Sequence, residues 1–279
     1  MKGDELLPLI ELLRVGPVAV LTGAGLSAGS GLPTYRGADG EWLHAQPIQH
    51  QAFLCSEAVR RRYWARSYAG WQTMGRAEPN AGHRVLAALE RGGRVSAVIT
   101  QNVDGLHHKA GSRAVIELHG AIGRVRCIGC DETFPRAAVQ DWLGAANPGF
   151  PAARASAAAG APDGDAHLDE ALHGDFVVPA CPACGGVLKP DVVFYGDGVP
   201  RERVSAAMQV VEQCAALLVV GSSLMVYSGL RFARHAHRTG KPIVAINRGI
   251  TRADALLSMK IDADCSETLE RILTGLHAD

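Results

Sequence analysis

Short apolar runs alternate with helical patterns along most of this chain, and this alternation limits the possible folds more than any other feature. Five such runs end at glycine or polar residues: "PVAVLTGAG", "VSAVITQNVDG", "AVIELHG", "ALLVVGSSL" and "PIVAINRG". Between them, apolar residues recur every three or four positions in "NAGHRVLAALERGG" and "PRERVSAAMQVVEQC". Strands that are apolar throughout and alternate with helices form a parallel sheet with helices on both faces. The sequence therefore predicts an α/β fold whose ligands lie beyond the carboxyl ends of the strands.

The alternation stops between residues 124 and 189. This stretch contains two C-x-x-C pairs and an irregular span, "GAANPGFPAARASAAAGAPDGD", rich in Ala, Pro and Gly. Such a composition without a steady period is typical of a loop. We therefore predict a main domain formed by residues 1–123 and 190–279. Residues 124–189 are predicted to form a small inserted module with a long loop at 144–166.

The two cysteine pairs supply four thiolates, enough to complete a tetrahedral zinc site of the structural kind. They are Cys127 with Cys130 and Cys181 with Cys184. The separation between the pairs exceeds the usual 15 to 20 or so residues, so the site requires the predicted loop as an insertion. A redox dithiol is the alternative, and the presence of two pairs argues against it. The remaining cysteines are interpreted as small buried apolar residues: Cys55, Cys214 and Cys265.

A glycine-rich loop follows the first predicted strand, in "VLTGAGLSAGSGLPTYRG". Gly23, Gly25 and Gly29 give G-x-G-x-x-x-G, one residue longer than the usual dinucleotide fingerprint. The expected second strand with an acidic residue about twenty positions later is also missing. The loop is therefore predicted to bind a dinucleotide in a manner unlike that of an ordinary dehydrogenase.

Polar residues follow two further strands. "TQNVDG" offers Gln101, Asn102 and Asp104, and an Asn amide with an Asp carboxylate can pair with a carboxamide. The alternative is an Asx-turn that only caps the next helix. "ELHG" places His119 at the end of another strand, with Gly120 allowing close approach. Because histidine titrates near neutrality, His119 is a candidate general base.

The charge balance limits the possible partners. Lys plus Arg and Asp plus Glu number 28 each among 279 residues, so no overall basic field favours nucleic acid or anionic lipid. The first residues, "MKGDELLPLIELLR", resemble a short amphipathic helix rather than a signal or transit peptide. No stretch reaches the roughly twenty apolar residues of a membrane span. We therefore expect a soluble cytoplasmic protein without nucleic-acid or membrane partners.

Seven blocks together resemble the sirtuins in type and order: "GAGLSAGSGLPTYRG", "TQNVDGLH", "HG", the C-x-x-C pairs, "KPDVVFYGD", "GSSL" and "IN". "YWAR", "HKAGSR", "APDGD", "GGVLKPDVVF" and "GSSLMVYSG" are closest to the class II, sirtuin-4-like branch. The resemblance implies a Rossmann-like NAD-binding domain and a small zinc domain. It also implies a cleft between them for NAD, used as a co-substrate, and an acyl-lysine protein substrate.

The resemblance also implies roles for individual residues. His119 and Asn102 are the implied catalytic residues. The implied NAD-binding residues are Gly23, Ala24, Gly25, Ser27, Tyr35, Arg36, Trp42, Gln101, Asn102, Val103, Asp104, Gly221, Ser222, Ser223, Asn247, Arg248, Gly249 and Cys265. The implied peptide-binding residues are Val193, Phe194, Tyr195 and Gly196.

The chemistry that the resemblance implies has two stages. The acyl oxygen of the substrate lysine first attacks the ribose carbon that bears nicotinamide. His119 then removes a proton from a ribose hydroxyl. The expected products are free lysine, nicotinamide and an O-acyl-ADP-ribose.

Three segments depart from the usual family pattern. Tyr35 replaces the usual Phe, the "FGE" segment reads Tyr195-Gly196-Asp197, and Ser228 stands where many members have Pro. These residues touch the nicotinamide side, the edge of the substrate strand and a loop. They bear on acyl preference and rate rather than on the reaction class.

"RRRYWARSYAGW" contains Tyr63 and Arg66, which would share one face of a helix. A tyrosine hydroxyl and an arginine fork so placed could hold a carboxylate. The spacing is similar to the element with which class III sirtuins recognise succinyl and glutaryl lysine. The alternative is an ordinary solvated helix face. The clamp would give a preference for acidic acyl groups over acetyl.

The leading interpretation is an NAD-dependent protein-lysine deacylase. One alternative is protein mono-ADP-ribosyl transfer, which needs the same activated NAD with another nucleophile. Another is a non-catalytic NAD-sensing module, in which His119 would have no purpose.

Overall fold

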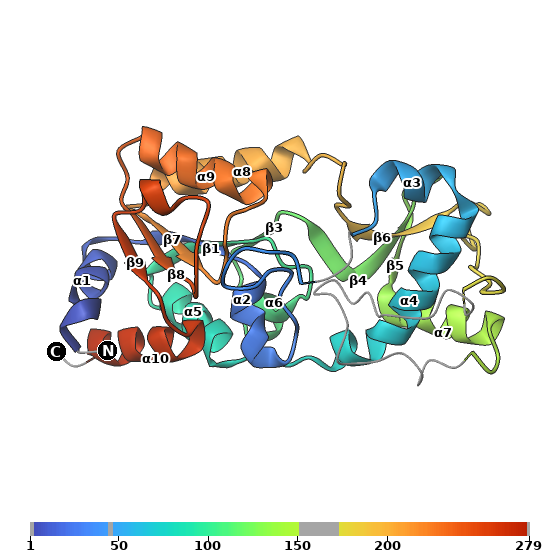
Figure 1. Ribbon diagram of the computed structural model, residues 1–279, viewed down its shortest axis with the longest axis horizontal. Coiled ribbons are helices and arrows are strands. Elements are labelled where there is room, and N and C mark those ends of the chain that lie inside the picture. The colour runs from blue at the N-terminus through green and yellow to red at the C-terminus, as the bar shows by residue number, and fades with distance from the viewer. Residues whose placement is uncertain (1–2, 44–46, 151–172, 278–279) are drawn as a thin grey trace.

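A computed structural model describes residues 3–43, 47–150 and 173–277. The chain forms a larger and a smaller lobe, which lie side by side along the long axis of the molecule (Figure 1). A six-stranded sheet forms the centre of the larger lobe, and a three-stranded sheet belongs to the smaller one.

The larger sheet is parallel throughout and has the strand order β3-β2-β1-β7-β8-β9. This is the order of doubly wound dinucleotide-binding folds, in which the crevice opens where the strand order reverses. The reversal falls between β1 and β7. The strands are β1 (Val18–Thr22), β2 (Val95–Thr100), β3 (Val115–Glu117), β7 (Leu217–Val220), β8 (Ile243–Ile246) and β9 (Met259–Ile261).

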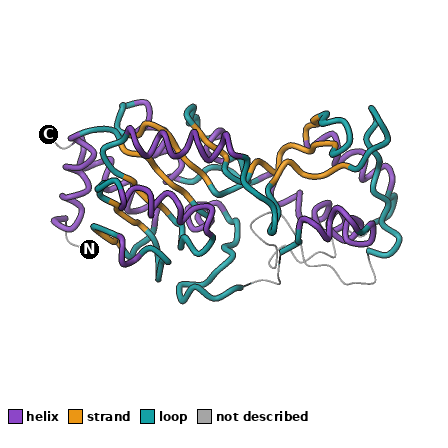
Figure 2. The backbone as a smooth tube through the Cα atoms, turned by 90° about the horizontal axis from the view of Figure 1, so that it is seen from above, coloured by secondary structure: helices purple, strands orange, loops and turns teal. Residues whose placement is uncertain are grey.

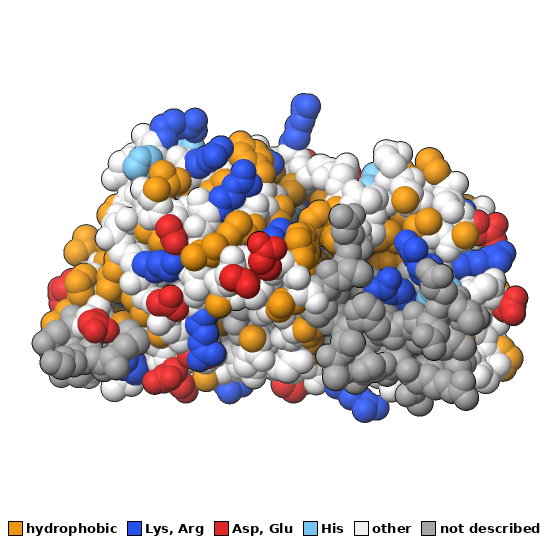
Figure 3. All heavy atoms as spheres, in the orientation of Figure 1, with side chains coloured by type: hydrophobic (Ala, Val, Ile, Leu, Met, Phe, Trp, Pro, Cys, Tyr) orange, Lys and Arg blue, Asp and Glu red, His pale blue; other side chains and the backbone are white. Residues whose placement is uncertain are grey.

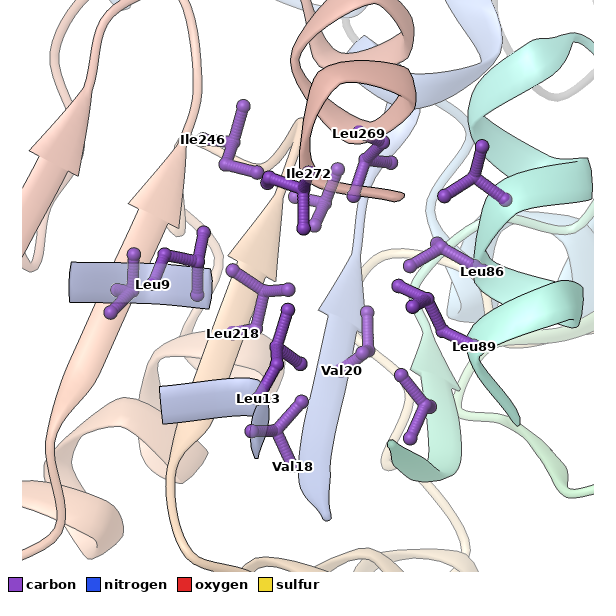
Figure 4. Close-up of a cluster of buried hydrophobic side chains, with 14 of the residues drawn as sticks. Leu9, Leu13, Val18, Val20, Leu86, Leu89, Leu218, Ile246, Leu269 and Ile272 are labelled. Atoms are coloured by element: carbon purple, nitrogen blue, oxygen red, sulfur yellow. The ribbon is translucent and has the colours of Figure 1, made fainter. Parts of the chain in front are cut away.

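Helices cover both faces of this sheet, as the sequence predicts (Figures 1 and 2). Val18 and Val20 point to one face and Ala19 and Leu21 to the other, because neighbouring strand residues alternate. Figure 4 shows the first face, where α1, α5 and α10 pack on β1, β7 and β8. The helices are α1 (Leu7–Val15), α5 (Ala81–Arg91) and α10 (Cys265–His277) on that face, and α8 (Arg201–Gln213) and α9 (Tyr227–Arg238) on the other.

The smaller lobe contains the antiparallel sheet β5-β4-β6 and three helices. Its buried core joins side chains that lie far apart in the sequence, such as Phe53, Trp64, Val125 and Leu188. The elements are α3 (His50–Cys55), α4 (Glu57–Arg76), β4 (Gly120–Cys127), β5 (Thr133–Pro135), α7 (Arg136–Ala146) and β6 (Leu188–Val192).

The expected division at residues 124–189 stays a prediction, and the packing adds a second segment to the small core. Helices α3 and α4 come from the part of the chain that the sequence suggests for the main domain, yet their side chains pack against β4 and β6. An amphipathic pattern shows that a helix has a buried face but not which core it joins. The predicted long loop at 144–166 begins later than expected, because α7 continues to Ala146, and residues 151–166 of it lie outside the described residues.

Both basic and acidic side chains of the described residues occur on the face seen in Figure 3. Among the described residues, no helix has the length and apolar character that crossing a membrane requires.

Candidate active site between the two lobes

A pocket of about 650 Å³ lies at the carboxyl ends of β1, β2, β7 and β8 and extends to the segment after β6. Pockets for small molecules and cofactors have volumes of roughly 300 to 1,000 Å³. Most of the predicted NAD- and peptide-binding residues line it. They are Gly23, Ala24, Gly25, Ser27, Tyr35, Arg36, Gln101, Asn102, Val103, Asp104, His119, Val193, Phe194, Tyr195, Gly196, Gly221, Ser222, Ser223, Asn247, Arg248 and Cys265.

The first glycine-rich loop turns directly from β1 into the short helix α2 (Ala24–Ser27). Its glycines allow close backbone contact with the loop after β7. A Cβ on Gly25 would lie 2.9 Å from the Cα and carbonyl oxygen of Gly221, and one on Gly23 would lie 2.8 Å from the same oxygen. Gly221 itself has φ +62°, and a Cβ there would lie 2.2 Å from the nitrogen of Leu26. Glycine is therefore required on both sides of this contact.

Ser27 joins the polar residues beneath the loop into one network. Its hydroxyl donates to Asp104 Oδ2 at 2.7 Å and lies 3.0 Å from the side-chain nitrogen of Asn102. Asp104 Oδ1 also accepts the Leu106 N–H at 2.9 Å, so the Asx-turn considered from the sequence is present. Asp104 thus caps helix α6 (Leu106–Lys109) and also lines the pocket. Burial raises the pKa of Asp104 against the effect of these hydrogen bonds.

Two buried histidines lie behind this network, and the sequence analysis did not identify them. His83 Nε2 lies 3.5 Å from the Ser27 hydroxyl, and His107 Nε2 lies 3.0 Å from the Thr22 hydroxyl. The two rings meet edge to face with centroids 4.9 Å apart. Burial lowers the pKa of His83 to about 4 and that of His107 to about 3. Both rings are therefore neutral at physiological pH. Their sequence signal is weak, because a single histidine in a helical pattern is ordinary.

His119 follows β3 and lines the pocket. Its Nδ1 lies 2.8 Å from the Gln101 carbonyl oxygen, and its Nε2 lies 2.8 Å from the Ser228 hydroxyl. Burial lowers the pKa of His119; the bond to Gln101 opposes this, and the charge of Arg203 adds to it. A lowered pKa keeps the imidazole neutral at physiological pH, as a general base requires.

The segment after β6 runs beside His119. The Val193 N–H donates to the His119 carbonyl at 2.8 Å, and the His50 N–H donates to the Tyr195 carbonyl at 2.8 Å. Gly120 permits this approach: it has φ +80°, and a Cβ there would lie 2.0 Å from the Asp191 carbonyl oxygen. The expected close approach at Gly120 is thus present, with the backbone of the small lobe as its partner.

The loop after α2 carries Tyr35, which lines the pocket, and Trp42, which packs against it. The Arg36 guanidinium lies 4.2 Å from the centre of the Trp42 ring, and Trp42 meets Tyr35 and Tyr195 edge to face. Trp42 and Gly249 are absent from the described pocket lining, although the resemblance implied that both bind NAD. Gly249 has φ +77°, and a Cβ there would lie 2.1 Å from the carbonyl oxygen of Ala38. The close contact with the Ala38 backbone thus explains why residue 249 is a glycine.

Tyr63 and Arg66 lie on α4, in the smaller lobe, as the helical pattern predicts. Tyr63 is only 4% exposed and packs edge to face on Phe53 and Phe194. Phe194 lines the pocket, so Tyr63 lies one layer behind that wall. Neither Tyr63 nor Arg66 belongs to the described pocket lining, and the acyl clamp stays a prediction.

The four paired cysteines form a compact cluster in the smaller lobe. Their Sγ atoms all lie within 4.8 Å of one another. Cys127 and Cys184 are 3.5 Å apart and Cys130 and Cys181 3.9 Å. A zinc ion with Zn–S bonds of about 2.3 Å places its sulfurs about 3.8 Å apart, so the cluster fits structural zinc. The Gly129 and Gly186 N–H groups also point at cysteine sulfurs, as suits thiolates.

A parallel sheet with this strand order and a glycine-rich first loop is typical of α/β proteins that bind dinucleotides. Residues 23–228 match the Sir2 family. The chain therefore belongs to the Sir2 family.

Relatives and solved structures extend over nearly the whole chain. The chain is 55% identical over 250 residues to an "NAD-dependent protein deacetylase" of Xanthomonas campestris pv. campestris (strain 8004), covering 90% of this chain and 84% of that protein. It is 52% identical over 254 residues to "NAD-dependent protein deacetylase 2" of Bradyrhizobium diazoefficiens, covering 91% and 92%.

The fold is similar to solved Sir2 structures. A complex described as "Sir2-p53 peptide-NAD+" matches with a TM-score of 0.77 and 27% identity over 100% of both chains. "Sir2 bound to acetylated peptide" matches with a TM-score of 0.75 and 28% identity, covering 99% of this chain and 100% of that one.

Proposed function

We propose that this protein is an NAD-dependent protein-lysine deacylase, which transfers the acyl group to ADP-ribose and releases nicotinamide. One observation carries the proposal. A single pocket joins the glycine-rich loop, the neutral His119 imidazole and the segment Val193–Gly196 that follows β6. These three parts would bind a dinucleotide, act as a general base and bind a peptide, respectively. The curated relatives named as NAD-dependent protein deacetylases support the same activity.

NAD would lie across the carboxyl ends of β1 and β7. Gly23 and Gly25 let the first loop pack against Gly221, so that both loops line the part of the pocket where the dinucleotide would lie. Asp104 and Asn102 line the same pocket and would face the nicotinamide carboxamide. Asn247 and Cys265 line the far end, where adenosine would lie. When bound, NAD supplies a ribose carbon with nicotinamide as its leaving group.

The protein's own groups bind, orient and accept a proton. The backbone of Val193–Gly196 would align the peptide so that the acyl-lysine points toward His119. His119 would act after nicotinamide has left, by taking the proton of a ribose hydroxyl onto Nε2. The Gln101 carbonyl fixes the proton of the neutral ring on Nδ1, because a carbonyl oxygen can only accept. The four-cysteine cluster would hold zinc at a distance from this chemistry, with a structural role.

Three finer assignments belong to the same proposal. Placement in the class II, sirtuin-4-like branch is supported by "YWAR" and "GSSLMVYSG". A cytoplasmic location is supported by seven cysteines that form no disulfide, because disulfides form mainly in oxidising compartments. Partners other than nucleic acids or membranes are supported by the equal numbers of basic and acidic residues.

Mass spectrometry of the products tests the reaction class. Purified protein is incubated with NAD and a lysine-acylated peptide. An O-acyl-ADP-ribose together with free peptide lysine is the expected result. ADP-ribosylated protein without acyl-ADP-ribose would show that ADP-ribosyl transfer is the activity instead. NAD binding without any conversion would indicate a sensing module.

A further inference from the structure

Ser228 is hydrogen-bonded to the His119 ring nitrogen that would accept a proton if His119 acts as a general base. Its hydroxyl lies 2.8 Å from Nε2 of His119, while Nδ1 lies 2.8 Å from the Gln101 carbonyl. Because the carbonyl only accepts, Nδ1 carries the ring proton and Nε2 carries the lone pair. The Ser228 hydroxyl therefore donates to the one basic lone pair of the neutral ring.

The first turn of α9 holds this contact in place. A serine at the start of a helix usually bonds to nearby backbone, but the partner here lies 109 residues earlier in the chain. The next residue, Gly229, is buried, and a Cβ there would lie 2.6 Å from Gln101 Nε2. The Gln101 Oε1 atom is in turn held by the Ser222 hydroxyl at 2.6 Å. The helix start thus packs closely on Gln101, the same residue that orients the other side of the His119 ring.

The contact lies inside the pocket rather than behind it. Both Ser228 and His119 line the cavity, as do Gln101 and Ser222. A ligand hydroxyl that approaches Nε2 must therefore take the position of the Ser228 hydroxyl.

We propose that Ser228 is a positioning residue that competes with the ribose hydroxyl of NAD for Nε2 of His119, and so slows proton abstraction relative to nicotinamide release. This inference rests on the proposed function. In the abstraction step the ribose O–H bond breaks, an N–H bond forms at Nε2, and the electron pair stays on the ribose oxygen. Ser228 keeps its own proton, and its hydrogen bond to Nε2 is replaced by that of the ribose hydroxyl. A hydrogen bond of ordinary net strength corresponds to a rate effect of about 2- to 10-fold.

Two rates measured on the same full-length protein test this. One is deacetylation of an acetyl-lysine peptide, which needs the base. The other is incorporation of labelled nicotinamide into NAD in the presence of that peptide, which reverses nicotinamide release and precedes the base. Ser228→Ala should raise the ratio of deacetylation to exchange about 2- to 10-fold. Ser228→Thr keeps the hydroxyl and should retain the wild-type ratio.

The ratio separates this role from a structural one, because partial unfolding lowers both rates together. Ser205→Ala, at an exposed position on α8, is the matched control and should change nothing. An unchanged ratio in Ser228→Ala would overturn the proposal. A ratio that falls by about 10²-fold would also overturn it, because Ser228 would then relay the proton rather than compete for the base.

A second measurement needs no activity. The ¹⁵N resonance of His119 Nε2 in the ligand-free protein, assigned with His119→Gln, should shift in Ser228→Ala and stay in place in Ser205→Ala. An unshifted resonance overturns the Ser228 bond. Failure of the proposed deacylase function gives a different result from failure of the Ser228 proposal. In that case the wild-type protein would show neither exchange nor deacetylation with any acylated peptide.

Discussion

The larger and smaller lobes surround one pocket but are stabilised by different interactions. In the larger lobe, the four central strands β1, β2, β7 and β8 bury apolar side chains on both faces of the sheet. In the smaller lobe the sheet has three strands. The third, β6, follows the second cysteine pair in the chain and pairs with β4. Cys127 and Cys184 are brought to 3.5 Å by that pairing. The comparison indicates that apolar packing on both faces of a sheet stabilises most of the larger lobe, whereas the smaller lobe adds a cross-link through its four cysteines to its apolar core.

Removal of zinc is expected to give the largest difference between the lobes. Structural zinc contributes about 10 to 16 kcal/mol of apparent binding free energy in small zinc domains, and this is folding free energy. Cys181→Ser should therefore lose the metal and the hydrogen-exchange protection of β4 and β6, while β1 and β7 stay protected. Metal analysis of the wild-type protein should find one zinc per chain.

Cys214 and Cys265 are buried as expected from the sequence, but Cys55, the last residue of α3, is exposed, so that interpretation is wrong for Cys55. Cys55→Ser is therefore the matched control, because Cys55 also lies outside the cluster. It should keep the metal and full protection. Freshly purified active protein with well under one equivalent of zinc would contradict the structural role.

Mild acid should affect the larger lobe through its buried histidines. The folded-state pKa values of His83 and His107 are about 4 and about 3, below the ordinary value of about 6.5 expected in the unfolded chain. The unfolded chain therefore binds more protons below pH 6.5 or so. Stability is complete above that pH and falls as the pH drops toward the folded values. The expected loss between about pH 7 and pH 5 is of the order of 2 kcal/mol for each histidine.

The exchange protection of β1 and β2 measures this loss in the larger lobe alone. His107→Gln should weaken the dependence on pH, and His237→Gln, at an exposed position, should leave it unchanged. Protection in β1 and β2 that is equal at both pH values would show that the two rings are not held neutral by burial.

Gly120→Ala tests the contact between β4 and β6 at the point where the chain passes from His119 into the smaller sheet. The φ of +80° and the 2.0 Å approach to Asp191 leave no room for a Cβ, so strain of about 1 to 3 kcal/mol is expected. The same change moves His119 relative to β6, and a displacement of about 1 Å can lower turnover about 10²-fold. Thermal unfolding and steady-state turnover measure the two effects.

Gly123→Ala lies on the same strand, and an added Cβ meets nothing within 4 Å there. It should match the wild type in both measurements. Equal behaviour of the two variants would show that β4 and β6 are not tightly packed at Gly120.

The same contrast between the lobes explains what the sequence could predict. Five of the six strands of the larger sheet were predicted, because continuous apolar runs mark buried parallel strands. The short edge strand β9, "MKI", and β5, "TFP", have no such signal. Helices α3 and α4 have apolar faces, but only the folded chain shows that these faces pack on β4 and β6.

The candidate site also contains residues that the sequence could identify and contacts that it could not. His119, Asp104 and the cysteine pairs follow strand ends or fixed spacings, so local patterns identify them. The bond from Ser228 to His119 and the close contact of Gly25 with Gly221 join distant segments. Ser228 stood out in the sequence only as a departure from the family's usual Pro, which gave no partner for its hydroxyl.

Arg66→Met gives the smallest expected effect. If Tyr63 and Arg66 hold an acidic acyl group, the variant should lose preference for glutaryl over acetyl lysine and keep residual deacetylation. An ion pair of up to about 1 kcal/mol corresponds to about a five-fold change in that ratio. Competition between the two acylated peptides measures it, with exposed Arg62→Met as the control. Acetyl removed faster than any dicarboxylic acyl group, with no response to Arg66→Met, would exclude the clamp.

The central claim is that this pocket is a deacylase site. It is tested most directly by measuring nicotinamide release from NAD with and without a lysine-acylated peptide. The wild-type protein should release nicotinamide only when the acylated peptide is present, in step with loss of the acyl group. His119→Ala should lower this turnover about 10²- to 10⁴-fold while NAD binding stays unchanged, because a base serves the chemistry and not the docking. Release that is independent of the acylated peptide, or near-normal turnover in His119→Ala, would contradict the assignment of this pocket as a deacylase site.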